Sequence, residues 1–251
     1  FIRPEDYTAD LAPYADHLIP SLTVGNRGDH LDLIQKSRAV ELAYEPGVEA
    51  VFDELRANNK DLIVIVRLPL DAEAADKALV LARSDVDTLH FVADDHGNEL
   101  NAAEPRFLKE MIREVHLKLV DNALRQKLNL LFSGGIAMAE HMAKAILCGA
   151  DAVVAANVLL LALECRLCYR CQEGLTCPAK LETDFDTDWG KQRIINLIGA
   201  WHSQLIELMG AMGIREARRL RGEVGRSMWF EDLERENFGP IFGTRKVTGL
   251  G

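Results

Sequence analysis

The sequence predicts an α/β fold built on a parallel sheet, because short apolar runs alternate with longer helical patterns along most of the chain. The apolar runs are rich in branched residues and have the length of buried strands, over residues 39–43, 62–68, 88–93, 129–132 and 152–156. Ala, Leu, Glu and Lys dominate the stretches between them and favour helices over residues 47–58, 72–82, 105–125 and 139–148. Repeated βα units suit either a doubly wound sheet or part of a (β/α)8 barrel, and the pattern alone does not separate the two.

The segments on either side of this alternation have a different character. Residues 1–38 mix turn-forming Pro and Gly with scattered apolar residues and indicate an irregular lead-in. An apolar stripe at helical spacing predicts a long helix that ends near Gly213, followed by a second helical piece over 215–226. That piece carries five arginines, which indicate a solvated or docking face in preference to a phosphate site. The glycine-rich tail from Asn237 is expected to be extended.

Composition argues against several classes of protein. A chain of 251 residues that is 48% hydrophobic can bury a substantial core. Its net charge of −10 argues against a nucleic-acid binder, since phosphate contacts need a basic face. The longest apolar run, residues 152–163, is shorter than the roughly twenty residues that span a bilayer, so no membrane span is expected. Reduced, clustered cysteines favour a cytoplasmic protein.

Four of the five cysteines are crowded together in the pattern CxxCxxCx5CP, formed by Cys165, Cys168, Cys171 and Cys177 with Pro178 after the last. This spacing is typical of an iron–sulfur cluster, because bacterial ferredoxins wrap a cluster with a similar run that also ends in proline. Structural zinc is the alternative, but zinc knuckles usually split their ligands into two distant pairs. A disulfide is disfavoured, since no secretory signal is recognised. Cys148 is expected to be a small buried hydrophobic residue.

Residues 131–171 carry a resemblance to a known family. Their sequence, LFSGGIAMAEHMAKAILCGADAVVAANVLLLALECRLCYRC, gives the order strand, glycine pair, helix, GAD, strand and cysteines. This order resembles the FMN-binding synthase domain of glutamate synthase, in its short archaeal-type branch. The stretches AVELAYEPG at 39–47 and VIVRLP at 64–69 resemble the family more loosely. The resemblance implies a partial or complete (β/α)8 TIM-barrel-type domain, followed by an iron–sulfur cysteine loop and C-terminal helices.

On this resemblance the chain divides into four parts. They are the irregular lead-in over residues 1–38, a βα-repeat barrel portion over 39–163, an iron–sulfur cluster loop over 164–190, and a C-terminal helical segment and tail over 191–251. Four cysteine ligands imply a [4Fe-4S] cluster. A [3Fe-4S] cluster on Cys165, Cys171 and Cys177 is the alternative, with Cys168 facing away.

The resemblance also implies a possible FMN site. The loops after the last two strands of the barrel would bind the flavin phosphate through Ser133, Gly134 and Gly135 in one loop and Ala156 and Asn157 in the other. Arg67 stands where the family has a lysine near the flavin ring, and the two side chains are not interchangeable.

Several of these positions depart from the family's pattern. The Cβ atoms of Ala155 and Ala156 would crowd a phosphate, and in the loop after residue 93 only His96 and Gly97 resemble the family's glycine-rich sequence. These departures argue against the FMN that the resemblance implies.

Plainer interpretations stay open at each of these positions. Gly134 and Gly135 could form only a tight turn, and Arg67 could pair with Asp71 or Glu73. Asp94, Asp95 and His96 follow a predicted strand, where barrels place chemistry, but a solvated loop is the favoured interpretation.

Two functions follow from the cysteines and the resemblance. The favoured one is an iron–sulfur electron-transfer subunit of a larger redox complex, built on a degenerate glutamate-synthase-like barrel. Its partners would be other redox subunits, such as a flavoprotein or a ferredoxin-like protein, in a hetero-oligomer. The alternative is an active FMN and iron–sulfur oxidoreductase that reduces 2-oxoglutarate or an imino acid. A zinc-stapled structural protein is a third, weaker hypothesis.

Overall fold

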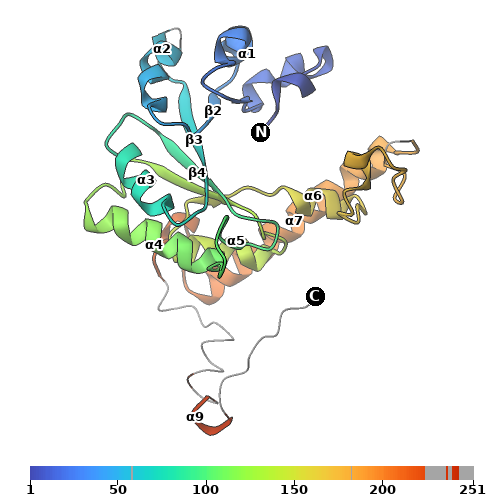
Figure 1. Ribbon diagram of the computed structural model, residues 1–251. Helices are drawn as coiled ribbons and strands as arrows, with labels where there is room; N and C mark the ends of the chain where they lie inside the picture. The colour runs from blue at the N-terminus through green and yellow to red at the C-terminus, as the bar shows by residue number, and fades with distance from the viewer. Residues whose placement is uncertain (58, 182, 224–235, 237–238, 243–251) are drawn as a thin grey trace.

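The protein is an α/β structure around one six-stranded parallel sheet (Figure 1). The computed structural model describes residues 1–57, 59–181, 183–223, 236 and 239–242. The strands are β1 (Ser21–Leu22), β2 (Ala39–Ala43), β3 (Ile63–Pro69), β4 (Thr88–Val92), β5 (Asn129–Ser133) and β6 (Ala152–Val153). Strands adjacent in the chain are adjacent in the sheet, from β1 to β6. A doubly wound sheet reverses its strand order part-way, so this order identifies the winding as that of a (β/α)8 barrel.

Helices connect the strands and continue after the sheet. They are α1 (Leu31–Lys36), α2 (Phe52–Ala57), α3 (Ala74–Leu81), α4 (Leu108–Asp121), α5 (Ala139–Cys148), α6 (Asn157–Ala162), α7 (Thr187–Ala211) and α9 (Gly239–Phe242). Short 3-10 turns cover Pro4–Asp6, Ala9–His17, Arg27–His30, Val48–Val51, Arg170–Glu173 and Ala217–Leu220. Helix α5 has the predicted bounds and ends at Gly149, whose φ of 129° suits the glycine that stops a helix.

Three expected segments differ from the structure. The lead-in is not wholly irregular, since it contributes α1 and the strand β1, which pairs with β2. The last strand, β6, ends at Val153 and is therefore shorter than the strand predicted over residues 152–156. In place of a helix over 215–226 the structure has the single turn Ala217–Leu220, and residues 224–226 lie outside the described residues. The extended tail predicted from Asn237 is described only over α9.

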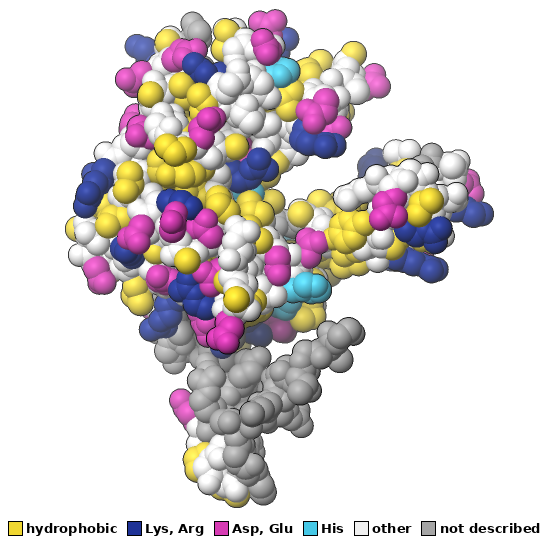
Figure 2. Space-filling model, viewed as in Figure 1, with side chains coloured by type: hydrophobic (Ala, Val, Ile, Leu, Met, Phe, Trp, Pro, Cys, Tyr) yellow, Lys and Arg dark blue, Asp and Glu magenta, His cyan; other side chains and the backbone are white. Residues whose placement is uncertain are grey.

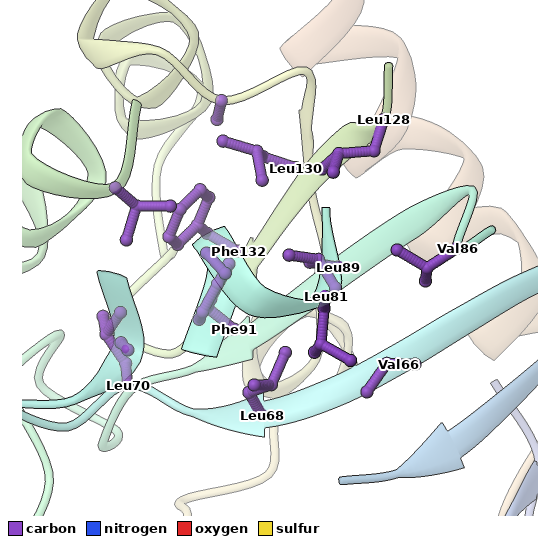
Figure 3. Packing of buried hydrophobic residues seen from close by; sticks show 14 of the residues in the cluster. Val66, Leu68, Leu70, Leu81, Val86, Leu89, Phe91, Leu128, Leu130 and Phe132 are labelled. Atoms are coloured by element: carbon purple, nitrogen blue, oxygen red, sulfur yellow. The ribbon is translucent and has the colours of Figure 1, made fainter. Parts of the chain in front are cut away.

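The apolar core lies between the sheet and its covering helices. Along β3, β4 and β5, alternate side chains on the helix-facing side are fully buried, among them Val66, Phe91 and Phe132 (Figure 3). Phe91 and Phe132 stack with their ring centroids 5.2 Å apart. Because side chains alternate across a strand, the intervening positions project from the opposite face of the sheet. That inner face carries polar residues, which are described with the site below.

The described sheet is open between β1 and β6. These two strands pair with β2 and β5 respectively, and within the described residues no strand joins one to the other. The protein therefore shows six strands of a barrel-type sheet. None of the helices in the described part of the chain is long and apolar enough to cross a lipid bilayer.

The cysteine segment and the C-terminal helices lie beyond β6. Figure 1 shows the cysteine segment projecting to one side of the sheet and α7 running from this projection back toward α5, against which it packs. The carboxylate of Asp186 caps α7 by accepting hydrogen bonds from the backbone N–H groups of Asp188 and Trp189. Trp201 and Met209 anchor this helix by burial.

The predicted basic face after α7 is only partly solvated. Arg218 and Arg219 are exposed and form ion pairs with Glu216. Arg221 instead lies against the barrel portion and forms an ion pair with Asp151, with 2.5 Å between Nη1 and Oδ1. Its side chain therefore ties the C-terminal segment to the loop before β6.

Candidate functional site

A cavity of about 490 Å³ lies at the carboxyl ends of β4, β5 and β6. Its walls come from the loops after these three strands and from the cysteine segment. The lining residues are Val92, Ala93, Asp95, His96, Ser133, Gly134, Gly135, Ile136, Ala137, Val154, Ala156, Asn157, Val158, Leu161, Leu167 and Tyr169. The structure therefore brings together five of the six predicted cofactor-binding residues, and Arg67 is not among the lining residues.

Positions 134 and 135 require glycine, because two tightly packed turns meet there at the edge of the cavity. Their φ angles are +95° and +66°, in the left-handed region that favours glycine. A Cβ atom at position 134 would lie 2.5 Å from the backbone oxygen of Asp94, and one at position 135 would lie 2.5 Å from the Cα atom of Gly97. The turn after β5 thus packs directly against the turn after β4. Both glycines form a tight turn and line the cavity at the same time.

Asp94 organises the turn after β4. One of its carboxylate oxygens accepts hydrogen bonds from the backbone N–H groups of His96 and Asn98, at 2.9 and 2.7 Å. Partial burial of this carboxylate opposes ionisation, but the hydrogen bonds from Asn98 and His96 outweigh it and lower the pKa of Asp94. The carboxylate is committed to holding the loop, which leaves Asp95 and His96 to face the cavity.

Asp95 joins the cysteine segment to the barrel. Its carboxylate accepts a hydrogen bond from the side-chain amide of Asn157 at 2.8 Å and another from the hydroxyl of Tyr169. Tyr169 lies between Cys168 and Cys171 in the sequence. The segment that carries the cysteines is therefore fixed against the carboxyl end of β4 and closes one side of the cavity.

The lining of the cavity suits a phosphate group poorly. It includes the carboxylate of Asp95, and none of the described lining residues is Lys or Arg. Ala156 also stands where the resemblance would need a glycine for close approach of the backbone to an anion. A phosphate placed here would face a negative charge without a compensating cation. The described lining residues thus offer no cationic side chain to the phosphate end of FMN, which leaves backbone N–H groups such as those of Gly134 and Gly135 as its donors.

Arg67 has a different partner from the ones predicted. Asp71 and Glu73 both form ion pairs with Lys77, so the predicted pairing of Arg67 with either is wrong. The guanidinium of Arg67 instead lies 3.7 Å from the carboxylate of Glu41 on the inner face of the sheet.

The four clustered cysteines lie on a sharply turning and largely exposed segment. Cys168 and Cys171 are exposed, and Cys165 and Cys177 are half-buried. The backbone N–H of Leu167 donates a hydrogen bond to Sγ of Cys165 at 3.4 Å, an interaction that stabilises a ligating thiolate. Across the described residues, no three His, Cys, Asp or Glu side chains are close enough to hold a metal ion. The donor set suits a cluster chemically, and binding would require the segment to draw its thiols together.

Cys148 is a small buried hydrophobic residue, as predicted. Its side chain lies on α5 and is 4% exposed. Burial raises the pKa of its thiol to about 11, so it is protonated and unreactive at neutral pH.

A buried polar network on the inner face of the sheet was not predicted. Glu41 on β2, His90 on β4 and Ser133 on β5 are each less than 10% exposed. His90 Nδ1 lies 2.6 Å from Oε1 of Glu41, and His90 Nε2 lies 2.9 Å from Oγ of Ser133. Ser21 on β1 hydrogen-bonds the other carboxylate oxygen of Glu41 at 2.5 Å, and the ring of Phe1 stacks on the imidazole. In the sequence, this network is signalled only by Glu41 and His90, each an ionisable residue within a mainly apolar strand.

Glu41 is held in its ionised form by this network. Burial of Glu41 opposes its charge, but the hydrogen bonds from His90 and Ser21, together with the charges of His90 and Arg67, outweigh burial and lower its pKa. A carboxylate whose pKa is lowered in the folded state stabilises the fold at pH values above its unfolded-state pKa of about 4.3. This stabilisation is lost as the pH falls through the folded-state pKa.

We expect Glu41→Gln to lower the free energy of unfolding at pH 7 by about 3 kcal/mol, because it breaks a buried charged hydrogen-bond network. We also expect the variant to lose less stability than the wild type between pH 5 and pH 3, because the titrating carboxylate is gone. Urea unfolding at a series of pH values measures both effects, with the exposed Glu49→Gln as the matched control. An unchanged pH slope in Glu41→Gln would contradict the assignment.

Comparison with known proteins identifies the family. The family model for the conserved region in glutamate synthase matches residues 31–215. The chain belongs to the glutamate synthase family. The matched region contains the whole cavity, the four clustered cysteines, and Glu41, His90 and Ser133 of the inner-face network. The resemblance expected from residues 131–171 is therefore confirmed.

Curated members of the glutamate synthase family are similar over much of this chain. Archaeal glutamate synthase [NADPH] from Methanocaldococcus jannaschii is 29% identical over 270 residues, covering 84% of this chain and 52% of the relative. The protein of the same description from Archaeoglobus fulgidus is 34% identical over 133 residues, covering 50% of this chain and 26% of the relative. The chain thus spans about half the length of the first of these relatives and a quarter of the second.

Solved structures confirm the barrel-type fold of this glutamate synthase family member. A flavocytochrome b2 variant with pyruvate bound superposes with a TM-score of 0.59 at 15% identity, covering 100% of this chain and 67% of that chain. A mandelate oxidase variant with a monooxide FMN adduct gives a TM-score of 0.55 at 18% identity, covering 84% and 65%. At such low identity the likeness establishes the fold alone.

Proposed function

We propose that this chain is an iron–sulfur electron-transfer module of a larger glutamate-synthase-type redox complex. The observation that carries the proposal is the position of the cysteine segment. Through Tyr169 and Leu167 it forms one wall of the cavity at the carboxyl ends of the strands, which is where barrel enzymes place their chemistry. A cluster on this segment would lie next to the site where a redox partner or cofactor exchanges electrons.

In this proposal the cluster is a [4Fe-4S] centre held by Cys165, Cys168, Cys171 and Cys177. When bound, it would accept and donate single electrons. The chain's own residues would adjust this chemistry. The N–H group of Leu167 donates to the sulfur of Cys165, and two arginines, Arg166 and Arg170, alternate with the cysteines. Hydrogen bonds to sulfur and nearby positive charge both favour the reduced, more negative state of a cluster.

An active FMN and iron–sulfur oxidoreductase is the second candidate, and the size of the cavity favours it. About 490 Å³ in contact with the cysteine segment falls in the range of small-molecule and cofactor sites. The chemistry of the lining favours the first candidate. Asp95 adds a negative charge that would repel a flavin phosphate, and Ala156 stands where a glycine would let the backbone approach that phosphate. A flavin in a partner subunit satisfies the family's redox chemistry without a flavin in this cavity.

Partner subunits have a suitable surface on the projecting part of the chain. Large apolar side chains are exposed on α6, the cysteine segment and α7: Leu160, Leu161, Leu175, Phe185, Trp189, Ile195 and Ile198. Figure 2 shows apolar and basic side chains together on the projecting part. Exposed apolar side chains on neighbouring elements are typical of an interaction site, so the proposed hetero-oligomer with other redox subunits would form here. We propose a cytoplasmic location for this assembly, because free thiols and iron–sulfur clusters persist in a reducing compartment.

The proposal is tested by the composition of the protein purified without oxygen. We expect iron and inorganic sulfide on the chain and no stoichiometric flavin. Flavin bound at one per chain beside the iron would support the second candidate instead. A colourless protein that contains zinc would contradict both.

A further inference from the structure

The electron-transfer role leaves the inner-face network unused, and its geometry is that of a catalytic triad. Ser133, His90 and Glu41 form a continuous chain of hydrogen bonds from hydroxyl to imidazole to carboxylate, with heavy-atom distances of 2.9 and 2.6 Å. This is the order of contacts that activates a serine nucleophile in unrelated hydrolase folds. A triad is recognised by geometry and roles, and the three residues here come from three separate strands of one sheet.

The contacts of His90 match those that such a triad needs. Glu41 is held as a carboxylate, so its Oε1 accepts the proton of His90 Nδ1. In the neutral tautomer that carries its proton on Nδ1, the other ring nitrogen, Nε2, accepts the hydroxyl proton of Ser133. Ser21 holds the far oxygen of the carboxylate, and Phe1 covers the imidazole ring. The Glu41 carboxylate and the Phe1 ring therefore both orient His90, the general base.

Ser133 also meets a space in which a substrate can bind. Although it is only 6% exposed, it lines the cavity at the carboxyl end of β5. The backbone N–H groups of Gly134 and Gly135 follow it directly, on a turn that lines the same cavity and is braced by the loop after β4. A backbone N–H adjacent to the nucleophile is a recurring donor to the oxyanion in serine hydrolases.

We propose that Ser133, His90 and Glu41 form a catalytic triad that hydrolyses small, uncharged acyl esters bound in the cavity. The oxygen of Ser133 attacks the ester carbonyl carbon while its proton passes to His90 Nε2. The carbonyl re-forms as the carbon–oxygen bond to the alcohol breaks, and His90 returns the proton to the leaving alcohol. Water then attacks the acyl–serine ester, with its proton again passing through His90, and the products are a carboxylic acid and free Ser133.

The lining of the cavity defines the substrate class. Its walls are mainly apolar, with Val92, Ile136, Val154 and Leu161 among them. Asp95 contributes a negative charge, and no Lys or Arg is among the described lining residues. Anionic esters are therefore excluded by repulsion, and short neutral acyl groups match the apolar walls.

A fluorophosphonate probe tests the triad on the whole purified chain. The probe forms a phosphorus–oxygen bond to an activated serine and releases fluoride, so intact mass and peptide mapping locate the adduct. We expect one adduct per chain, on Ser133, and none in Ser133→Ala. His90→Gln is expected to slow labelling about 100-fold or more, the usual contribution of a general base. The rate of p-nitrophenyl acetate hydrolysis should fall in parallel.

Two comparisons keep the test decisive. Ser84→Ala removes a hydroxyl that only hydrogen-bonds the backbone oxygen of Leu81, so it should label like the wild type. Circular dichroism on Ser133→Ala and His90→Gln establishes that each remains folded. If the folded wild type forms no adduct at Ser133, or if His90→Gln labels as fast as the wild type, the network has a structural role only and the proposal is overturned. Iron content is unaffected by either result, so the electron-transfer proposal is judged separately.

Discussion

Replacing Cys171 with serine abolishes iron binding by the anaerobically purified chain. Cys171 is exposed, and in the proposal it belongs to the ligand set of both the four-iron and the three-iron cluster. A serine oxygen is a poor ligand for iron in such a cluster, whose irons are held by thiolates. We expect iron to fall from about four per chain to less than about one, with loss of the visible absorption. Inductively coupled plasma mass spectrometry and a spectrum on the same sample measure both.

Two matched variants sharpen this experiment. Cys148→Ala alters the buried cysteine of α5 and should retain the iron. Cys168→Ser separates the two cluster types, because Cys168 is a ligand only in the four-iron form. About three irons per chain in both the wild type and Cys168→Ser would indicate the [3Fe-4S] alternative, whereas a fall from about four irons in the wild type would indicate the [4Fe-4S] cluster. Full retention of iron in Cys171→Ser would contradict the assignment of the segment.

Replacing Gly134 with alanine destabilises the fold by about 3–5 kcal/mol, within the range of the most damaging single substitutions. Two costs add at this position. The left-handed conformation costs about 1–2 kcal/mol for a residue with a Cβ atom. That atom would also lie 2.5 Å from the backbone oxygen of Asp94 and 2.6 Å from that of Ala93, and backbone cannot move aside as a flexible side chain can. Urea unfolding followed by circular dichroism gives the free energy of unfolding.

Gly47→Ala is the matched control for this prediction. Gly47 also has a left-handed φ, of 85°, but a Cβ atom there meets no other atom within 4 Å. It should therefore cost only the conformational part, about 1–2 kcal/mol. The difference between the two variants isolates the close approach of the turns after β4 and β5. Equal losses in both variants would show that the two turns are not in tight contact.

Much of the fold could be predicted because its signals are local. The strand residues 39–43 and 88–92 are runs of branched and apolar residues, and α5 has both a helical pattern and a terminal glycine. Local sequence patterns could not distinguish a doubly wound sheet from a barrel, because the difference depends on which strands are neighbours in the sheet. The strand β1 was missed because Ser21–Leu22 is too short to show a period.

The candidate site was predictable only in part, for a similar reason. The resemblance brought Ser133, Gly134 and Gly135 to one loop, and the structure places this loop on the cavity. The inner-face network could not be read from the sequence, because Glu41 and His90 meet only when β2 and β4 lie in one sheet. The contact of Tyr169 with Asp95 likewise joins residues far apart in the chain.

We propose that this member of the glutamate synthase family carries a cluster beside its cavity and no flavin within it. One measurement tests it most directly: an anaerobic ultraviolet–visible spectrum with iron, sulfide and flavin quantified on the same sample. We expect a broad band at about 400 nm, about four irons and four sulfides per chain, and no stoichiometric flavin. Stoichiometric flavin on the chain, with or without iron, or zinc in place of iron, would contradict it.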